Sequence, residues 1–433
     1  MRLLFSGQLE SIELGLIIAQ SLQMNYEELT RDIELVCSWF SIKTELTLAE
    51  KFQFVSSQKI VSLPDCDWKV IPPQIKYLIN LQELSICRSQ ATEVPAEIGM
   101  LTNLIHLDLS GNQITHLPAE IGNLSHLVTL RLHFNKLQSL PAEIGNLSKL
   151  TSLDLRSNQL SSLPRELGGL SGLVTMDLSS NQLISLPKEI GNLTELLSLD
   201  ISYNKLTLLS AEIGGPTKLK TLRLCYNKLT AIPLEMANLT ELETLNLDRN
   251  KLVVFPAAIH GLKNLTTLNL SRTHLAELPS AISNLTRLTG LFLESNKLVS
   301  LPAEIGKLSE LTMLNIDDNQ ISSLPKEIGK LTRLTGLYIN KNQLRELPSA
   351  IKRLKKLTHL EARGNQLTTI PVEISYLVKL ETLSLRNNEL PHIGEEIAAL
   401  TNLQELSLEN NPLSTEQKEQ IKSWLPTCKV TFD

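Results

Sequence analysis

The sequence lacks the features that mark several common classes of protein. No apolar run approaches the roughly 20 residues that a membrane-spanning helix requires, so we expect no transmembrane segment. The 433 residues contain only five cysteines, without a CxxC pair or the spacing of a metal site: Cys37, Cys66, Cys87, Cys225 and Cys428. This odd, thinly spread set favours a reducing compartment over a disulfide-bonded protein.

A strong excess of one charge is also missing. The chain has 41 Lys and Arg against 46 Asp and Glu, a net charge of −5, which argues against a surface built mainly for nucleic acid but leaves room for a local basic patch. Glu10 and Glu13 interrupt the apolar run that a signal peptide would need. We therefore predict a helix there and a cytoplasmic location, with export by an unrecognised signal as the alternative.

Catalytic motifs are absent from the sequence. It holds no GxxxxGK[ST] phosphate loop, HExxH zinc helix, GxSxG nucleophile elbow or set of kinase motifs. Cys428 is followed by Lys429 and Val430, with no indicated histidine or carboxylate to orient it, so we interpret it as a structural thiol. We expect a protein that is not an enzyme and has no cofactor, no metal and no small-molecule substrate.

What the chain does have is a repeat of 23 residues. Fifteen units follow one another without insertion or deletion, the first starting at Leu81 and the last at Leu403. The unit at Leu104 reads LIHLDLSGNQITHLPAEIGNLSH, that is, LxxLxLxxNxL followed by LPxEIGxL, and a degenerate unit begins at Gln58. This pattern is typical of a leucine-rich repeat.

Each position of the unit has a physical interpretation. The alternating leucines of LxxLxL predict a short strand with one buried face. Asn112 can donate and accept hydrogen bonds with the backbone of its own and neighbouring coils, and thirteen of the fifteen units keep Asn there, the exceptions being Ser89 and Thr273. Pro118 suits the first position of a short helical return, where Gly122 relieves crowding or ends the turn.

One coil cannot bury its own leucines, so neighbouring coils must stack. We predict an α/β solenoid, a leucine-rich-repeat horseshoe with a parallel concave β-sheet, short convex helices and helical caps. The expected domains are a helical N-terminal cap at residues 1–57, the solenoid at 58–413 and a C-terminal cap at 414–433, into which the last unit merges. Ser414 is the expected N-cap of a closing helix.

The unit resembles the 23-residue intracellular repeats of the Ras-suppressor and Scribble type, and is equally similar to the long, regular repeat proteins of many bacteria. The resemblance covers about residues 58–425. It implies a binding scaffold whose partners lie along the concave strand face. It does not identify a partner, because the consensus residues form the core and not the binding surface.

The residues that the consensus leaves free are the candidates for function. Tyr203, Tyr226, Arg249 and Arg272 occupy the eighth position of successive units, and at about 4.8 Å per strand they would form one stripe with Arg223 alongside. Tyr and Arg dominate interface hot spots, so the stripe predicts a protein-binding patch. The alternative is ordinary variation on an exposed face, where tyrosines stack for stability.

A second patch, acidic with two aromatic residues, lies further along the same face. Its members are Phe292, Glu294, Asp317, Asp318 and Tyr338, joined by Asn340. It suits a basic segment of a partner, and the alternative is a set of ordinary solvated carboxylates. Arg363 and Arg386 follow it, and such alternation of charge would favour one docking register over others.

These observations together predict a non-enzymatic scaffold that binds a protein or peptide on its concave face, with no nucleic-acid partner and no membrane span. Two other classes stay open: a secreted bacterial effector, and the recognition arm of a multi-component signalling enzyme or receptor. A purely structural repeat array is a further alternative, in which concave substitutions have no consequence.

Overall fold

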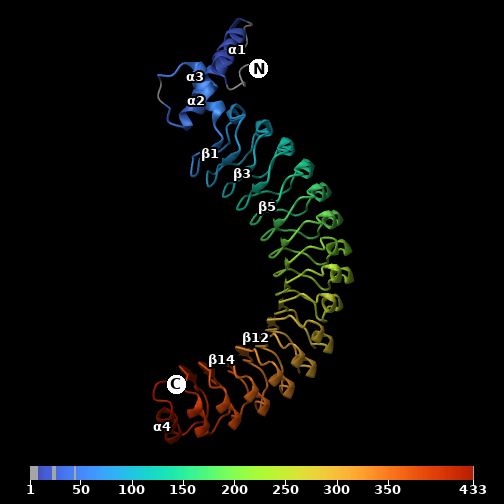
Figure 1. Cartoon of the computed structure of the whole chain (residues 1–433), viewed down its shortest axis with the longest axis vertical. Coiled ribbons are helices and arrows are strands. Elements are labelled where there is room, and N and C mark those ends of the chain that lie inside the picture. The colour runs from blue at the N-terminus through green and yellow to red at the C-terminus, as the bar shows by residue number, and fades with distance from the viewer. Residues whose placement is uncertain (1–7, 22–25, 43–44, 433) are drawn as a thin grey trace. The chain divides into compact units, whose positions relative to one another are not determined.

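The structure is a computed structural model that describes residues 8–21, 26–42 and 45–432. It contains two compact units, residues 1–205 and 206–433. Within each unit the strands follow the inner side, here called the strand face, and short 3₁₀ helices follow the outer face (Figure 1). The predicted leucine-rich-repeat solenoid, with parallel strands, short outer helices and a helical N-terminal cap, is confirmed.

Within the described ranges there are seventeen three-residue strands, and every pairing between them is parallel. Within the repeats a residue pairs with the one 23 positions later, as Leu107 does with Leu130, so the repeat length sets the register; the last pairing, Glu405 with Lys429, is offset by 24. In the first unit the strands are β1 (Ile60–Ser62), β2 (Glu83–Ser85), β3 (His106–Asp108), β4 (Thr129–Arg131), β5 (Ser152–Asp154), β6 (Thr175–Asp177) and β7 (Ser198–Asp200). In the second unit they are β8 (Thr221–Arg223), β9 (Thr244–Asn246), β10 (Thr267–Asn269), β11 (Gly290–Phe292), β12 (Met313–Asn315), β13 (Gly336–Tyr338), β14 (His359–Glu361), β15 (Thr382–Ser384), β16 (Glu405–Ser407) and β17 (Lys429–Thr431).

The outer face is formed by 3₁₀ helices. In the first unit these are η1 (Pro73–Tyr77), η2 (Ala96–Met100), η3 (Ala119–Asn123), η4 (Ala142–Asn146), η5 (Arg165–Gly169) and η6 (Lys188–Asn192). In the second unit they are η7 (Ala211–Gly214), η8 (Leu234–Asn238), η9 (Ala257–Gly261), η10 (Ser280–Asn284), η11 (Ala303–Lys307), η12 (Lys326–Lys330), η13 (Ser349–Arg353), η14 (Val372–Tyr376) and η15 (Glu395–Ala399). Pro118 stands just before η3 and not inside it, because its ψ of 152° still belongs to the extended connection.

Close packing of successive coils requires glycine on the outer face. A Cβ added to Gly122 would lie 2.5 Å from the carbonyl oxygen of Glu143 in the next coil, which is far inside van der Waals contact. The role predicted for Gly122, relief of crowding, is confirmed. Substitution there must push neighbouring coils apart.

The repeated asparagine joins each coil to its neighbours. The Oδ1 atom of Asn135 accepts the amide of Ile114 at 3.0 Å, and its Nδ2 donates to the carbonyls of Leu109 at 2.9 Å and Leu132 at 3.0 Å. Asn135 itself is buried. One side chain thus satisfies backbone groups in two coils that would otherwise be buried without partners, as the sequence predicts.

Three helices precede the first coil: α1 (Leu9–Ser21), α2 (Tyr26–Trp39) and α3 (Leu48–Ser57). The buried carboxylate of Asp32 in α2 accepts hydrogen bonds from Gln74 at 2.9 Å and from the hydroxyl of Tyr77 at 3.1 Å, both in η1. The Trp39 and Trp68 rings lie 4.9 Å apart between centroids. These contacts fix the helices on the first coil and cover its core.

The chain closes with α4 (Thr415–Trp424) and strand β17. Ser414 is the N-cap, since its side chain accepts the amide of Gln417 at 3.1 Å, and Ile421 and Leu425 are buried. The segment after Pro426 forms β17 beside β16, a strand that the sequence did not predict because no repeat follows it.

The backbone is distorted where the asparagine is replaced. Gln90 after Ser89 and His274 after Thr273 have φ angles of 60° and 65°, and Val253, in the coil before Thr273, has φ of 60°. The amide of Val253 donates to the carbonyl of Thr273 at 3.0 Å. A β-branched residue such as Val253 is strained in the left-handed region. The replacement of asparagine by Thr273 therefore weakens the junction between these two coils.

We expect Thr273→Asn to raise the free energy of unfolding by about 1 to 2 kcal/mol, because an amide side chain would restore the bonds to the preceding coil and release Val253. Asn250→Thr, which introduces the same departure one coil earlier, should lower stability by a similar amount. Urea unfolding of both variants followed by circular dichroism measures the two effects. A less stable Thr273→Asn protein would show that the surrounding coils have repacked to fit threonine.

Candidate functional site

The residues of the predicted tyrosine and arginine stripe are found at the end of their strands, on two units. Tyr203 belongs to the first unit, and Tyr226, Arg249 and Arg272 belong to the second, as does Arg223 on β8. The four eighth-position residues have φ angles between 52° and 55°, so they occupy the turn that leads from the strand to the asparagine. They lie at the rim of the strand face and not on the strands themselves.

Intramolecular contacts hold two side chains of this stripe. The guanidinium of Arg249 lies over the Tyr226 ring, 4.8 Å from its centroid, in a cation–π contact. Its Nε is 3.9 Å from Oδ2 of Asp248. Arg223 is exposed, on the strand that pairs with β9.

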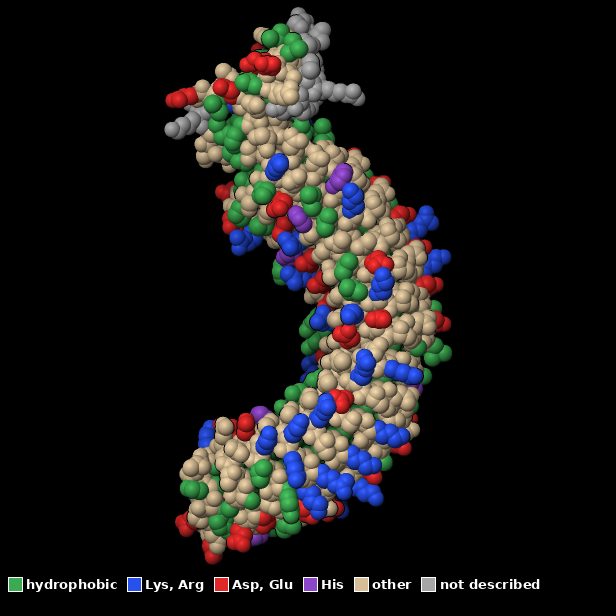
Figure 2. Space-filling view, viewed as in Figure 1, with side chains coloured by type: hydrophobic (Ala, Val, Ile, Leu, Met, Phe, Trp, Pro, Cys, Tyr) green, Lys and Arg blue, Asp and Glu red, His purple; other side chains and the backbone are tan. Residues whose placement is uncertain are grey.

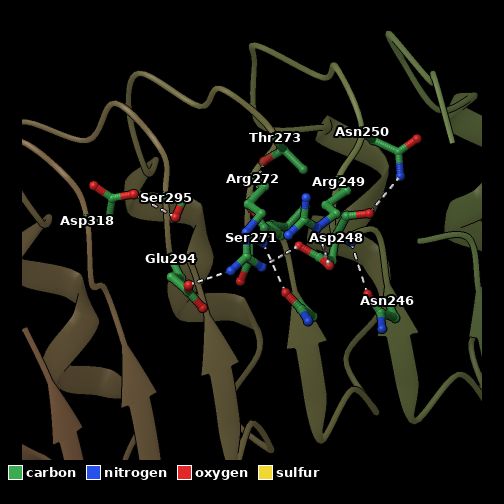
Figure 3. A network of polar contacts seen from close by, with 12 residues as sticks. Asn246, Asp248, Arg249, Asn250, Ser271, Arg272, Thr273, Glu294, Ser295 and Asp318 are labelled. Atoms are coloured by element: carbon green, nitrogen blue, oxygen red, sulfur yellow. Dashed lines mark hydrogen bonds and ion pairs between the residues drawn. The ribbon is translucent and has the colours of Figure 1, made fainter. Parts of the chain in front are cut away.

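Arg272 bridges two carboxylates of neighbouring coils. Its Nη1 lies 3.3 Å from Oδ1 of Asp248 and its Nη2 lies 2.6 Å from Oε1 of Glu294, while its own side chain is 34% exposed (Figure 3). The backbone amide of Asp248 donates to Oδ1 of Asn246 at 3.0 Å. Because both ends of this guanidinium are engaged, Arg272 acts as a clamp between coils and is less available to a partner than the sequence suggests.

The second predicted patch contains an apolar shelf. A Cβ on Gly290 would lie 3.0 Å from the Phe292 ring, and a Cβ on Gly336 would lie 2.9 Å from the Tyr338 ring. Each ring therefore lies along its own strand, over the glycine two residues earlier. Met313 occupies the same position on the strand between them, since it pairs with both glycines. The three side chains form a partly exposed apolar surface on the strand face.

Half-buried carboxylates border this shelf. Burial raises the pKa of Asp317 and of Glu361, and the ionised form of Asp317 raises that of Glu361 further. Burial also raises the pKa of Tyr338, with added repulsion from these two carboxylates. Asn340 offsets part of the cost by donating its amide to Asp317 at 2.6 Å and its Nδ2 at 3.0 Å. The charged forms of these acids are thus destabilised in the free protein.

A hollow of about 550 Å³ runs along the rim from the clamp to the last coil. Its lining alternates in charge and consists of Arg272, Glu294, Ser295, Asp317, Asp318, Asn340, Lys341, Glu361, Arg363, Ser384, Arg386, Ser407 and Glu409. Asp318 accepts a hydrogen bond from the Ser295 hydroxyl at 2.8 Å. The hollow thus joins one end of the predicted stripe, the acidic patch and the two arginines that follow it.

At the far end of the hollow, Oε2 of Glu409 is buried without a hydrogen-bond partner. A buried carboxylate oxygen without a donor is costly. Neither Glu361 nor Glu409 was predicted from the sequence. The sequence does contain a pattern that indicates the shelf: Gly290 and Gly336 are each followed two positions later by an aromatic residue.

Two features are absent from the described residues: a metal-binding group and a helix that could cross a membrane. In residues 8–21, 26–42 and 45–432, no group of three or more His, Cys, Asp and Glu is placed to hold a metal ion. Across the same ranges, none of the helices is both long enough and apolar enough to cross a membrane.

Family models and solved structures agree with this architecture. A model described as a leucine-rich repeat region matches residues 43–176, 120–202 and 302–428, and one described as a leucine rich repeat matches residues 217–275. No curated protein is similar enough in sequence to count as a match.

A solved leucine-rich-repeat protein of Leptospira interrogans is 39% identical, with a TM-score of 0.82, and the alignment covers 89% of this chain and 98% of that one. The ectodomain of a plant membrane receptor kinase from Arabidopsis thaliana is 29% identical, with a TM-score of 0.57, over 85% of this chain and 52% of that one. A functional domain of the Listeria monocytogenes protein InlJ, at 23% identity over 82% of this chain and 74% of that one, shares the fold with a TM-score of 0.59.

The family models match most of the chain, and a solved leucine-rich-repeat protein is 39% identical over 98% of its own length. The chain therefore belongs to the leucine-rich-repeat family, whose repeat domains are generally non-catalytic and typically serve as protein-binding scaffolds.

Proposed function

We propose that the second unit binds an extended segment of a protein or peptide in the hollow between Arg272 and Glu409. The observation that carries this proposal is the alternation of acidic and basic side chains along the hollow, beside the apolar shelf formed by Phe292, Met313 and Tyr338. Aromatic side chains on a rigid frame supply contact area at low entropic cost, and the charges select the register of the partner.

The length of the hollow favours a polypeptide over a small molecule. Arg272 and Glu409 stand six coils apart, which at about 4.8 Å per strand is about 29 Å. An extended chain rises about 3.3 Å per residue, so about nine residues would span that distance. The carboxylates of Asp317 and Glu361, which border the apolar shelf, suit a basic side chain, and Arg363 and Arg386 suit an acidic one.

The comparisons support the class of ligand. The Arabidopsis thaliana ectodomain was solved in complex with CASPARIAN STRIP INTEGRITY FACTOR 2. We also propose that the chain is a non-enzymatic scaffold with repeats of the 23-residue intracellular type, because its units carry the LPxEIGxL pattern. The few scattered cysteines support a cytoplasmic location for it.

A peptide-display library can test the hollow directly. Peptides of about nine residues selected on the full chain should lose affinity by tenfold or more on Glu294→Gln/Asp317→Asn/Glu361→Gln, because a charged contact in a partly desolvated site is worth about 1 to 3 kcal/mol. The matched control, Glu235→Gln/Glu304→Gln/Glu327→Gln on the outer face, removes the same charge and should bind normally.

The stripe is tested separately with Arg223→Ala/Tyr226→Ala/Arg249→Ala, which spares the clamp at Arg272. Circular dichroism first shows that each variant is folded. Calorimetry with the selected peptides then measures the affinity of the carboxylate variant and of the stripe variant. Equal binding by wild type and the carboxylate variant would refute the hollow. Loss of binding only in the stripe variant would return the site to the rim residues around Tyr226.

Binding of a basic peptide should weaken as the pH falls, because a cation needs ionised carboxylates. The raised pKa of Asp317 and of Glu361 places this loss at higher pH than for exposed carboxylates, whose pKa values are about 4. Titration calorimetry over a pH series measures the midpoint. Asp317→Asn/Glu361→Gln should bind more weakly and show a flatter profile, whereas affinity that rises on acidification would contradict the proposal.

A further inference from the structure

The outer face of the second unit carries a local charge that departs from the repeat. In η3 and η4 the outer segment reads AEIGN, with one carboxylate and no cation. In η11, η12 and η13 it reads AEIGK, KEIGK and SAIKR, which together contain five cations and two carboxylates. A chain of net charge −5 thus concentrates positive charge on three consecutive outer segments.

The five cations are exposed, and four of them line a depression. The five are Lys307, Lys326, Lys330, Lys352 and Arg353. A hollow of about 530 Å³ between η12 and η13 is lined by Lys326, Glu327, Lys330, Ser349, Ala350, Lys352 and Arg353. Ala350 stands where η11 and η12 have glutamate, so the lining has four cations against one carboxylate.

More cations flank these segments. Arg333, Lys355 and Lys356, in the connections that follow η12 and η13, are also exposed. The space-filling view shows Lys and Arg side chains gathered over the coils toward the C-terminus (Figure 2).

Exposed apolar side chains adjoin the cations in the next coil. Val372 is 65% exposed, Tyr376 55% and Val378 47%, all in η14 or just after it. An ion pair of 3.7 Å between Lys352 and Glu373 places this coil directly beside the basic one. Aliphatic side chains and a tyrosine next to lysines are the composition of a membrane-interface contact, where the tyrosine lies at the level of the headgroups.

We propose that the outer face over η11–η14 docks on a bilayer surface that contains anionic phospholipid. The cationic hollow receives lipid phosphate groups, and Val372, Tyr376 and Val378 enter the interfacial layer. A bilayer surface with anionic lipid offers both phosphate groups for the cations and an apolar layer for the exposed valines and tyrosine, whereas a nucleic-acid duplex offers phosphates but no apolar layer. The acidic pair Glu395 and Glu396 in η15 limits the contact on the C-terminal side.

Vesicle co-sedimentation of the full chain tests this contact, with phosphatidylcholine vesicles and with vesicles that also contain phosphatidylserine. We expect binding only to the anionic vesicles, with a decline as salt is added. Lys326→Gln/Lys330→Gln/Arg353→Gln should weaken the partition by about a hundredfold, because each cation at an anionic surface contributes about fivefold. Lys149→Gln/Arg165→Gln/Lys188→Gln removes as many exposed cations from the first unit and should bind like the wild type.

Two further measurements separate the lipid from other anions. Val372→Ser/Tyr376→Ser should reduce vesicle binding while the salt dependence stays the same. Duplex DNA and poly-glutamate are tested with the same variants. The proposal is overturned by failure to bind anionic vesicles, by equal binding of the basic-patch variant, or by binding to DNA or poly-glutamate that exceeds binding to vesicles. Peptide binding on the strand face is measured independently, so either contact can fail alone.

Discussion

The hydrogen bonds of the repeated asparagine are the constraint on which the other features depend. Asn135 and its equivalents face inward after each strand, and the chain reaches them through a left-handed residue at the eighth position. Gly111 and Gly364 meet this need without strain, and the other eighth-position residues do so with a side chain attached. The bonds of the asparagine hold the coils together, and the turn that precedes it places a row of side chains along the rim.

Much of this molecule could be predicted from the sequence because every coil solves the same packing problem. The period of 23, the alternating leucines and Gly122 lead directly to stacked coils, parallel register and crowded outer segments. The cap helix after Ser414 follows from its N-cap and apolar residues. Strand β17 does not, because it pairs only with the last coil and belongs to no repeat.

The candidate site was less predictable because its chemistry depends on which side chains pair. The sequence places Arg272 in a stripe with Arg249, but only the structure shows that Arg272 is held between Asp248 and Glu294. Likewise, Phe292 and Tyr338 are visible in the sequence as aromatics, whereas their orientation follows from the glycines beneath them. The repeat pattern fixes the backbone position of each residue. It does not fix which of several neighbours a long side chain contacts.

The exact register of 23 residues has a consequence for how such a protein can change. The coil at residues 334–356 contributes Tyr338 and Asn340 to the strand face, and Lys352 and Arg353 to the outer face. Duplication or loss of that one coil would leave the asparagine ladder in register on both sides. The strand face and the outer face would then lengthen or shorten together in a single genetic event, so the two surfaces change in size as a unit.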